Sequence, residues 1–466
     1  KTLNYLSTSK IASQGYIRNT DFGNNNAYYN GVWQPKFGKF DYQAGVNFKD
    51  YGANSFYSPK YPDQFEENKT YLGSVKFASN TKIKFSPAIY FRQNYDRFEL
   101  FRGYANAPSW YLQHNYHKTR TLGTSLNFWY DWAWGKTSLG GEYRKEEIVS
   151  SVLGENLLSP IYIAYESTKN GDSVKYTKGH TREVYSLFID HSLNYKKMFF
   201  SLGVMANYNT DSKTMNYFPG IDLSWAFIKK WRVYGSANSS MRMPTYTDLY
   251  YTSATLIGNT ALKPEEAVSY ETGFKFFYDA FHGNVSAFRR EGKNLIDWIK
   301  YPTDTKWRSE NLTNIDFQGI EANITMNPSK YSKKLSFINF ISASYAFLES
   351  SKKNQDFLSF YVLDQLKNKF VGTIDFAILK HIGWSVQGSY FDRYGSYQAY
   401  ENGLAATMVD FNPYWTVDSR VYWKSKKLNA YVEATNVFNQ KIVDVANVPQ
   451  PGRWFRVGAS YRIDWK

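Results

Sequence analysis

The chain ends in the stretch "WFRVGASYRIDWK" (454–466), and this stretch indicates the fold. From Phe455 to Trp465 every second residue is apolar or aromatic, whereas the residues between them are charged or small. A period of two is typical of a β-strand whose two faces meet different surroundings. The predicted strand, 455–465, is longer than an ordinary globular strand of about five or six residues. A long two-faced strand at the end of a chain is therefore the first feature to explain.

The same alternation recurs along the whole sequence. Clear examples are "FDYQAGVNF" (40–48), "VSYETGFKF" (268–276) and "LNAYVEATN" (428–436). Together such segments predict about twenty strands. The predicted strands lie near 2–12, 25–33, 40–48, 68–77, 82–94, 118–133, 135–150, 182–195, 198–209, 218–226, 231–242, 265–277, 281–299, 307–326, 335–348, 368–379, 382–391, 414–423, 428–436 and 455–465.

The joins between these strands alternate in length. Short joins such as "ASNT", "YKK" and "KSKK" are separated by longer ones. Short turns on one side and long loops on the other are typical of an outer-membrane barrel, whereas a β-sandwich shows no such bias. No blade repeat of about 40 residues indicates a propeller. The sequence therefore predicts an all-β fold, a transmembrane antiparallel β-barrel with long extracellular loops around 49–67, 95–117, 151–181, 243–264, 349–367, 392–413 and 437–454.

The composition agrees with a barrel wall. Of the 466 residues 19% are aromatic, yet mean hydropathy is −0.54. No apolar run approaches the roughly 18 residues of a transmembrane helix. Apolar residues at every second position predict one lipid-facing and one lumen-facing set. The lipid-facing set is Phe40, Tyr42, Val46, Val268, Tyr270, Phe274, Val457 and Tyr461, and the lumen-facing set is Asp41, Glu271, Lys275, Glu433, Arg456 and Arg462. Interfacial girdles are expected at Trp129, Trp132, Trp134, Trp231, Trp423 and Trp465.

The net charge is +15, and the lysines gather in the short joins. This placement indicates charged rims rather than a groove for nucleic acid, because no zinc, helix-turn-helix or RNP pattern accompanies the charge. Cysteine is absent, which excludes disulfide scaffolds and thiolate metal sites. The clustered lysines are Lys196, Lys197, Lys229, Lys230, Lys333, Lys334, Lys424, Lys426 and Lys427.

Several motifs in a fixed order carry a family resemblance. "RMPTYTDLYY" (242–251), "LKPEEAVSYETGFKFF" (262–277), "NVFNQ" (436–440) and "VPQPGRWFRVGASYR" (448–462) together resemble the C-terminal half of the TonB-dependent outer-membrane receptor barrel. "GYIRNTDF" and "SFYSPKYPDQFEENKT" resemble the cobalamin-receptor, BtuB-like branch, and the resemblance covers nearly the whole chain. In the first motif, Asp248 is expected to accept hydrogen bonds from backbone amides of a turn.

The resemblance implies the domain organisation. It implies one β-barrel domain over residues 1–466, with the N-terminal plug domain and the first hairpin not present in this chain. The complete receptor is expected to have 22 strands, against about twenty in this chain. Barrels of this width enclose a lumen that needs a plug.

The resemblance also implies a function. It is binding of cobalamin, or a related corrinoid, at the surface of the outer membrane and import into the periplasm with TonB-coupled energy. The expected partners are the corrinoid ligand, the TonB complex reached through the plug, outer-membrane lipid and a surface lipoprotein capping the loops, with one barrel per pore. The alternatives are a receptor for a siderophore or other metal chelate, and a passive porin.

Catalytic and metal chemistry leave little trace in the sequence. No serine stands out as a nucleophile paired with a histidine, so we predict that the protein is not an enzyme. His114 and His117 are close in sequence but show no third metal ligand. No cofactor is expected to be required. Calcium could bind extracellular-loop carboxylates, with Asp50, Asp63, Glu66 and Glu67 as candidates.

Loop aromatics are the candidate ligand contacts. A rigid aromatic ring offers a large contact area at low entropic cost, which suits a bulky, partly apolar ligand. The same residues could instead pack loops against each other, dock a partner or form the girdle. The candidates are Tyr104, Trp110, Tyr111, Trp298, Tyr301, Trp307, Tyr394, Tyr397 and Tyr400.

Overall fold

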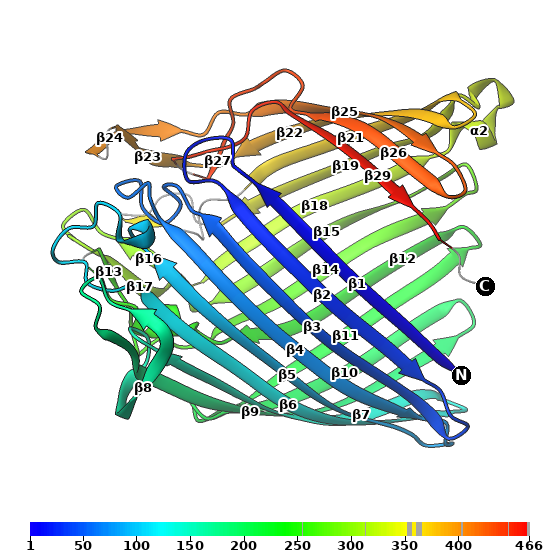
Figure 1. The fold of residues 1–466 in the computed structure, drawn as a ribbon. Coiled ribbons are helices and arrows are strands. Elements are labelled where there is room, and N and C mark those ends of the chain that lie inside the picture. The colour runs from blue at the N-terminus through cyan, green and yellow to red at the C-terminus, as the bar shows by residue number, and fades with distance from the viewer. Residues whose placement is uncertain are drawn as a thin grey trace.

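The structure is a computed structural model that describes residues 1–253, 255–312, 314–351, 357–359, 366–401, 404–445 and 447–463. Twenty of the 21 strands of its main sheet follow each other in chain order as an antiparallel wall, which curves into a barrel (Figure 1). These strands are β1 (Thr2–Ser13), β2 (Phe22–Trp33), β3 (Gly38–Gly52), β4 (Phe65–Ser79), β5 (Lys84–Glu99), β6 (Asn115–Trp132), β7 (Gly135–Ser150), β9 (Ser173–Tyr195), β10 (Met198–Asn209), β11 (Thr214–Ile228), β12 (Trp231–Arg242), β14 (Glu265–Phe277), β15 (Phe281–Lys293), β18 (Ile315–Met326), β19 (Ile338–Ser350), β21 (Leu366–Leu379), β22 (Ile382–Arg393), β25 (Tyr414–Lys424), β26 (Leu428–Thr435) and β29 (Trp454–Tyr461). The prediction of about twenty barrel strands is confirmed.

The predicted long loops lie together at one end of the barrel, on the left in Figure 1, and the connections at the other end have two to four residues except 327–337, which contains α2. The long-loop end carries β8 (Glu155–Ser167) and β23 (Ser396–Glu401), so the segments 151–181 and 392–413 share one side as expected. The remaining loop strands are β13 (Leu256–Ile257), β16 (Leu295–Lys300), β17 (Trp307–Leu312), β20 (Leu358–Ser359), β24 (Leu404–Asp410), β27 (Val443–Val445) and β28 (Val448–Pro449). In the part of the chain that is described, no helix has the length and apolar character to span a membrane.

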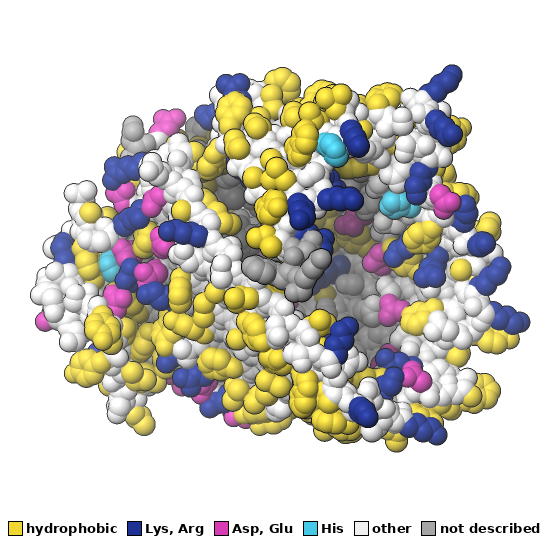
Figure 2. All heavy atoms as spheres, turned by 45° about the vertical axis from the view of Figure 1, so that its right-hand side comes forward, with side chains coloured by type: hydrophobic (Ala, Val, Ile, Leu, Met, Phe, Trp, Pro, Cys, Tyr) yellow, Lys and Arg dark blue, Asp and Glu magenta, His cyan; other side chains and the backbone are white. Residues whose placement is uncertain are grey.

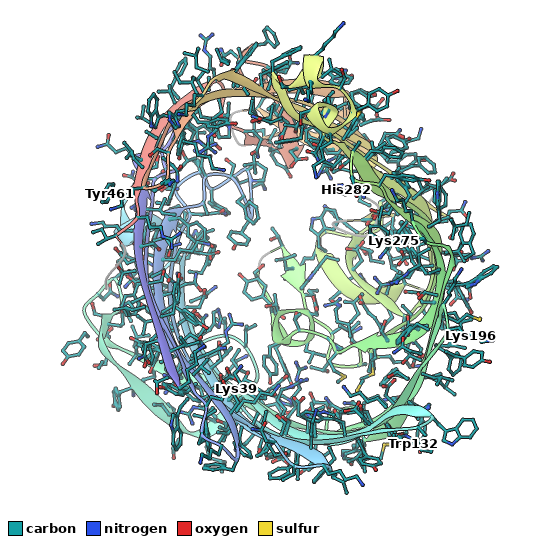
Figure 3. All side chains as sticks on the ribbon, turned by 90° about the vertical axis from the view of Figure 1, so that its right-hand side faces the viewer. Lys39, Trp132, Lys196, Lys275, His282 and Tyr461 are labelled. Carbon is teal, nitrogen blue, oxygen red and sulfur yellow. The ribbon has the colours of Figure 1, made fainter. Side chains whose placement is uncertain are left out.

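The two faces of the wall are plain in the view along the barrel axis. Figure 3 shows Lys39 and Lys275 directed into the lumen, whereas Trp132, Lys196 and Tyr461 point away from it. Because side chains alternate along a strand, each of these residues fixes the faces of its own strand. Figure 2 shows hydrophobic side chains spread over the outer wall and the lumen opening as a hollow at the short-turn end.

This alternation confirms the predicted faces on β3, β14 and β29. Contacts on the lumen side agree: Lys39 Nζ lies 2.9 Å from Asp41, and Arg456 Nη2 lies 2.5 Å from Glu433. Arg462 follows the end of β29, so the strand does not fix the direction of its side chain. The lipid-facing residues placed as predicted are Phe40, Tyr42, Val46, Val268, Tyr270, Phe274, Val457 and Tyr461.

Aromatic rings join neighbouring strands near the short turns. Trp33 stacks on Phe40 at 5.2 Å between ring centroids, Phe40 lies 4.7 Å from Phe77, and Phe77 lies 5.6 Å from Phe85. These four residues belong to β2, β3, β4 and β5, which the register aligns. Such pairs each add about 0.5–1.5 kcal/mol beyond the area that they bury. A continuous row of rings therefore stabilises this rim of the wall.

One predicted girdle residue is wrong and another is not described. Trp132 points outward, so Trp129, an odd number of residues earlier on β6, lies on the lumen side. There Lys136 Nζ lies 5.6 Å from its ring centroid. Trp465 lies outside the described residues. Trp134 is 68% exposed in the turn after Trp132, as a girdle residue requires.

Two predicted strands are each divided between the wall and the loops. The strand expected over 281–299 is divided into β15 and β16 at Asn294, which has a φ of 53°. The strand expected over 307–326 is divided into β17 and β18 beside Asn314, with a φ of 21°. Asparagine tolerates the left-handed region better than most side chains, and the chain leaves the wall at Asn294 and joins it again after Asn314.

Short helical turns occupy a few of the connections. They are η1 (Arg102–Tyr104), α1 (Tyr246–Tyr250), α2 (Pro328–Tyr331) and η2 (Lys333–Leu335). The predicted role of Asp248 is confirmed, because its Oδ2 accepts a hydrogen bond of 3.0 Å from the Thr245 backbone N–H. Thr245 Oγ1 in turn accepts from the Asp248 backbone N–H at 3.1 Å, which completes a capping box on α1.

The wall has a seam between its first and last strands. β1 pairs with β2 over its whole length, and β29 pairs with β26. Within the described ranges no ladder joins β1 to β29, although both lie on the same side of the barrel in Figure 1. Among the described strands, β1 and β29 therefore each have one edge without a partner.

Candidate functional site

The long-loop end contains an anchored loop cluster, made of residues 14–21, 53–64 and 100–114 and the tip 167–172 of the β8–β9 hairpin. Arg102 holds Asp21 through two hydrogen bonds of 2.7 and 2.9 Å. Arg18 donates from Nη2 alone to both carboxylate oxygens of Asp63, at 2.8 and 2.9 Å. The guanidinium of Arg102 lowers the pKa of Asp21, so this pair stays ionised at neutral pH. The two-pronged Arg102–Asp21 pair fixes geometry as well as charge.

An ionic group braces the β8–β9 hairpin against the outer side of the wall. Arg97 at the end of β5 lies 3.0 Å from Glu166 of β8, 3.0 Å from Glu99 and 3.4 Å from Glu67. The Tyr116 hydroxyl also donates to Glu166 at 3.0 Å. The four charged side chains are 6–26% exposed, so water screens them only in part. The hairpin and the 100–114 loop therefore depend on the same arginine.

Apolar packing supports the same hairpin. Tyr116, Val174 and Tyr176 are buried together, and Leu157 and Val149 pack against them. The chain reaches this position by crossing β9 at Gly154, where a Cβ atom would lie 2.5 Å from the Gly179 carbonyl oxygen. The φ of Gly154 is +108°, which only glycine adopts readily.

The predicted calcium candidates are spread over this region rather than gathered. Asp63 is paired with Arg18, and Glu67 lies 2.7 Å from Lys69. Glu66 accepts hydrogen bonds from the hydroxyls of Tyr51 and Tyr57, and Asp50 lies opposite Gly23 in the β2–β3 ladder. Glu66 and Glu67 are neighbours on β4, so they face opposite sides of the wall. In the described ranges, no group of three or more His, Asp or Glu is arranged to hold a metal ion.

His114 and His117 do not form a pair. His114 Nδ1 lies 3.0 Å from the Tyr111 hydroxyl, and its Nε2 lies 3.6 Å from Glu99. Burial, and then the charge of Arg97, lower the pKa of His114 to about 4. His117 Nδ1 instead lies 2.8 Å from Ser150 Oγ. At neutral pH His114 is therefore an uncharged hydrogen-bonding group inside the anchored loop cluster.

A second structure at this end, the mouth sheet, consists of β13, β17, β16 and β20. Three loops that are distant in sequence supply its strands. Leu295, Ile299 and Leu312 of β16 and β17 are buried together with Ile315 of wall strand β18, and Ile299 and Ile315 have no exposed surface. Green and yellow-green ribbon of this part of the chain lies within the outline of the barrel in the axial view (Figure 3). The mouth sheet therefore narrows the extracellular opening.

The nine aromatic candidates fall into three groups at this end. Tyr104, Trp110 and Tyr111 belong to the anchored loop cluster, Trp298, Tyr301 and Trp307 to the mouth sheet and its loop, and Tyr394, Tyr397 and Tyr400 to the region of the β23–β24 hairpin. Trp110, Tyr301 and Tyr394 are 61%, 37% and 38% exposed, so an incoming molecule can reach them. Tyr111 and Trp298 are buried. The remaining candidates are half-buried, and two of them pack on neighbouring rings: Tyr104 stacks on His114 at 4.0 Å and Tyr397 packs on Phe411 at 5.0 Å.

The lumen wall contains a polar hollow that was not predicted from the sequence. Trp132 points outward and pairs with Gly135, so the even-numbered residues of β7 face the lumen. The sequence feature that could have predicted this hollow is the series Glu142, Arg144 and Glu146, which places charge at every second position of β7. This wall hollow has a cavity volume of about 650 Å³ and is lined by Glu142, Arg144, Glu146, Arg182, Asn207 and Asn209, among others.

The wall hollow contains charged side chains and two buried amide groups that lack hydrogen-bond partners among the described residues. Glu146 lies 2.8 Å from Arg144 and 2.5 Å from Arg182. Asn209 is fully buried and Asn207 is 8% exposed, and in the described part of the chain Asn207 Oδ1 and Asn209 Nδ2 have no hydrogen-bond partner. Its volume lies within the range of small-molecule sites, and the two amides offer both an acceptor and a donor.

Comparison with known proteins adds a family match. Residues 5–437 match the family model described as TonB dependent receptor-like, beta-barrel. The vitamin B12 transporter of Vibrio vulnificus is 34% identical over 86 residues, 18% of this chain and 14% of that protein. The vitamin B12 transporter of Photobacterium profundum is 30% identical over 95 residues, 19% of this chain and 15% of that protein. The match thus spans about a seventh of the length of these curated relatives.

Solved structures resemble the chain over nearly its whole length. The copper transporter OprC gives a TM-score of 0.77 at 12% identity, covering 98% of this chain and 75% of that one. The siderophore receptor PirA of Acinetobacter baumannii gives 0.69 at 14% identity, covering 95% and 71%. A ferric enterobactin receptor of Pseudomonas aeruginosa gives 0.68 at 13% identity, covering 97% and 72%. At these identities the likeness shows the fold alone.

Proposed function

The chain belongs to the TonB-dependent receptor β-barrel family of the outer membrane, and on that premise we propose that it is the barrel of an active-transport receptor. In this proposal the loops bind a ligand at the cell surface, and TonB-coupled energy drives its import into the periplasm. The observation that carries the proposal is the mouth sheet, because strands from three loops pair there, and β16 and β17 are packed against wall strand β18, so that the sheet narrows the opening. A passive porin is the weaker alternative, because a sheet that narrows the opening would hinder free diffusion through the pore.

The ligand that we propose is cobalamin or a related corrinoid. The two curated relatives named as vitamin B12 transporters support this choice, at 34% and 30% identity over short segments. A siderophore or other metal chelate is the second candidate, since two of the similar structures are siderophore receptors. The exposed rings of Trp110, Tyr301 and Tyr394 suit the flat, partly apolar surface of a corrin.

We also propose that a plug domain and a first hairpin complete the receptor. The seam supports the hairpin, because the free edges of β1 and β29 are costly in lipid unless other strands pair with them. The wall hollow supports the plug, because Asn207 and Asn209 offer unmet hydrogen bonds to a polar surface in the lumen. TonB would act through that plug, and one barrel would form each pore. We further propose that a surface lipoprotein caps the loops and that calcium binds to the loops.

A binding titration tests the ligand. The full-length receptor in detergent is titrated with cyanocobalamin and, separately, with ferric siderophores, and the dissociation constant is measured by calorimetry. The variants Trp110→Ala, Tyr301→Ala and Tyr394→Ala should each weaken binding about tenfold or more if the residue is a central contact. Tyr331→Ala is the matched control, because Tyr331 is 78% exposed in α2 at the opposite end.

The outcomes separate the candidates. Tight binding of cyanocobalamin alone supports the corrinoid receptor, and tight binding of a ferric siderophore alone supports the second candidate. An equal loss of affinity in Tyr331→Ala and the loop variants would show that the loop aromatics are not the contacts. Binding of neither ligand class overturns both assignments.

A further inference from the structure

The turns at the short-turn end carry charge of nearly one sign. Nine connections join the wall strands there, all of two to four residues except 327–337, and seven of them contain lysine. The only carboxylate in the nine connections is Asp279. We call these lysines the turn-lysine ring: Lys36, Lys82, Lys196, Lys197, Lys229, Lys230, Lys330, Lys333, Lys334, Lys380, Lys426 and Lys427. Figure 2 shows dark-blue side chains gathered along this rim.

Nothing in the described part of the protein neutralises the ring. None of its lysines forms an ion pair within the described residues, and all except the half-buried Lys230 are exposed. The loops at the opposite end differ, because there arginines meet carboxylates in pairs such as Arg18–Asp63 and Arg308–Asp304. Unpaired charge of one sign raises the local potential and attracts anions. The ring therefore has the character of a docking surface.

The ring continues the lipid-facing surface. Lys196 points away from the lumen in Figure 3, and its Nζ lies 5.1 Å from the ring centroid of Tyr195. Lys230 Nζ lies 4.8 Å from the ring centroid of Tyr278. Trp132, which also points outward, is 46% exposed beside the same rim. Aromatic rings with lysines just beyond them are typical of the level of lipid head groups, where a lysine stem reaches out and its ammonium meets phosphate.

We propose that the turn-lysine ring binds the phosphate groups of anionic phospholipids in the periplasmic leaflet. The positive charge of the ring favours an anionic ligand, and its position at the edge of the lipid-facing wall favours a lipid. The interleaved aromatic rings favour a lipid over an acidic soluble protein, because they would otherwise stay in water. A lysine near an anionic membrane surface contributes roughly a fivefold increase in affinity, and the effect decays within a Debye length of about 8 Å at physiological ionic strength.

The experiment uses the full-length protein in nanodiscs of phosphatidylethanolamine mixed with phosphatidylglycerol. The test variant replaces Lys196, Lys197, Lys229 and Lys230 with glutamine. The control variant replaces four loop lysines, Lys60, Lys213, Lys263 and Lys441, with glutamine, so both variants lose the same charge. Each variant also changes one lysine with a left-handed backbone, Lys196 in the test and Lys213 in the control, with φ values of 54° and 51°. Native mass spectrometry counts the phosphatidylglycerol retained after release into detergent, and a heat-modified gel shift confirms folding.

The expected result is that the natural protein and the control retain phosphatidylglycerol in preference to phosphatidylethanolamine, and that the test variant loses this preference at least tenfold. High salt should reduce the preference in the natural protein. Equal retention in all three proteins overturns the proposal, and so does an equal loss in both variants, which would reflect net charge alone. Capture of an acidic periplasmic protein without phosphatidylglycerol preference also overturns it.

Discussion

Arg97 is the residue whose removal should most weaken the outer hairpin without unfolding the wall. In Arg97→Gln, Glu67, Glu99 and Glu166 lose their shared cation, which now lies 3.0–3.4 Å from each. Removing one partner of a buried ionic group costs about 3–5 kcal/mol. Arg97 is 24% exposed, so solvent screens part of this loss and we expect about 2 kcal/mol. The cost should appear as local opening of the β8–β9 hairpin.

Hydrogen exchange measures that opening. At about 1.4 kcal/mol for each factor of ten, amides of residues 155–172 and 100–114 should lose protection about 30-fold, whereas those in the middle of β18 should not change. Arg120→Gln is the matched control on the adjacent strand β6. Arg120 is 45% exposed and lies 3.4 Å from Glu147, so its loss should change protection by no more than about threefold. Unchanged protection in Arg97→Gln, or equal losses in both variants, would refute the role of the ionic group.

Val457→Arg on the lipid-facing side of β29 should reduce the free energy of unfolding by about 2–4 kcal/mol in bilayers, whereas Ser460→Arg on the lumen side should change it by less than about 1 kcal/mol; equal costs in urea titrations would contradict the assignment of faces. Because the pKa of His114 is about 4 in the folded loop and about 6.5 when unfolded, the unfolded loop binds more protons between these values. The loop should therefore be fully stable above about pH 6.5 and lose stability as the pH falls toward 4. Proteolysis of 100–114 should speed up over that window in the natural protein and less so in His114→Gln, and parallel pH profiles would rule out His114 as the cause. Finally, residues 1–466 alone in a planar bilayer should conduct small ions, the full-length receptor should not, and the plug added in trans should lower the conductance; free conductance by the full-length protein would favour the porin alternative.

Part of the candidate site followed from the sequence, because loops between predicted strands had to meet at one end. The positions of the nine aromatic candidates at that end were predictable for this reason, yet their exposure was not. Tyr111 is buried beside the rings of Phe101, Tyr104 and His114, whereas its neighbour Trp110 is exposed. Trp298 is buried in β16 of the mouth sheet, whereas Tyr301, just after that strand, is exposed. The carboxylates Glu66 and Glu67 were grouped by sequence proximity, whereas the strand places them on opposite faces.

The sequence by itself determined the strands, their two faces and the alternation of turns and loops, because each depends on a period of two or on neighbouring residues. It also determined the turn-lysine ring, since the turns lie between adjacent strands. Only the tertiary structure decided the mouth sheet, in which β13, β16, β17 and β20 come from three separate loops. The sequence predicts one continuous strand through β15 and β16, but the chain turns at Asn294, whose backbone is left-handed, and β16 pairs with β17 and β20 instead. Pairings of that kind depend on contacts between distant segments, and the free energy of such contacts is not written in any one stretch of the chain.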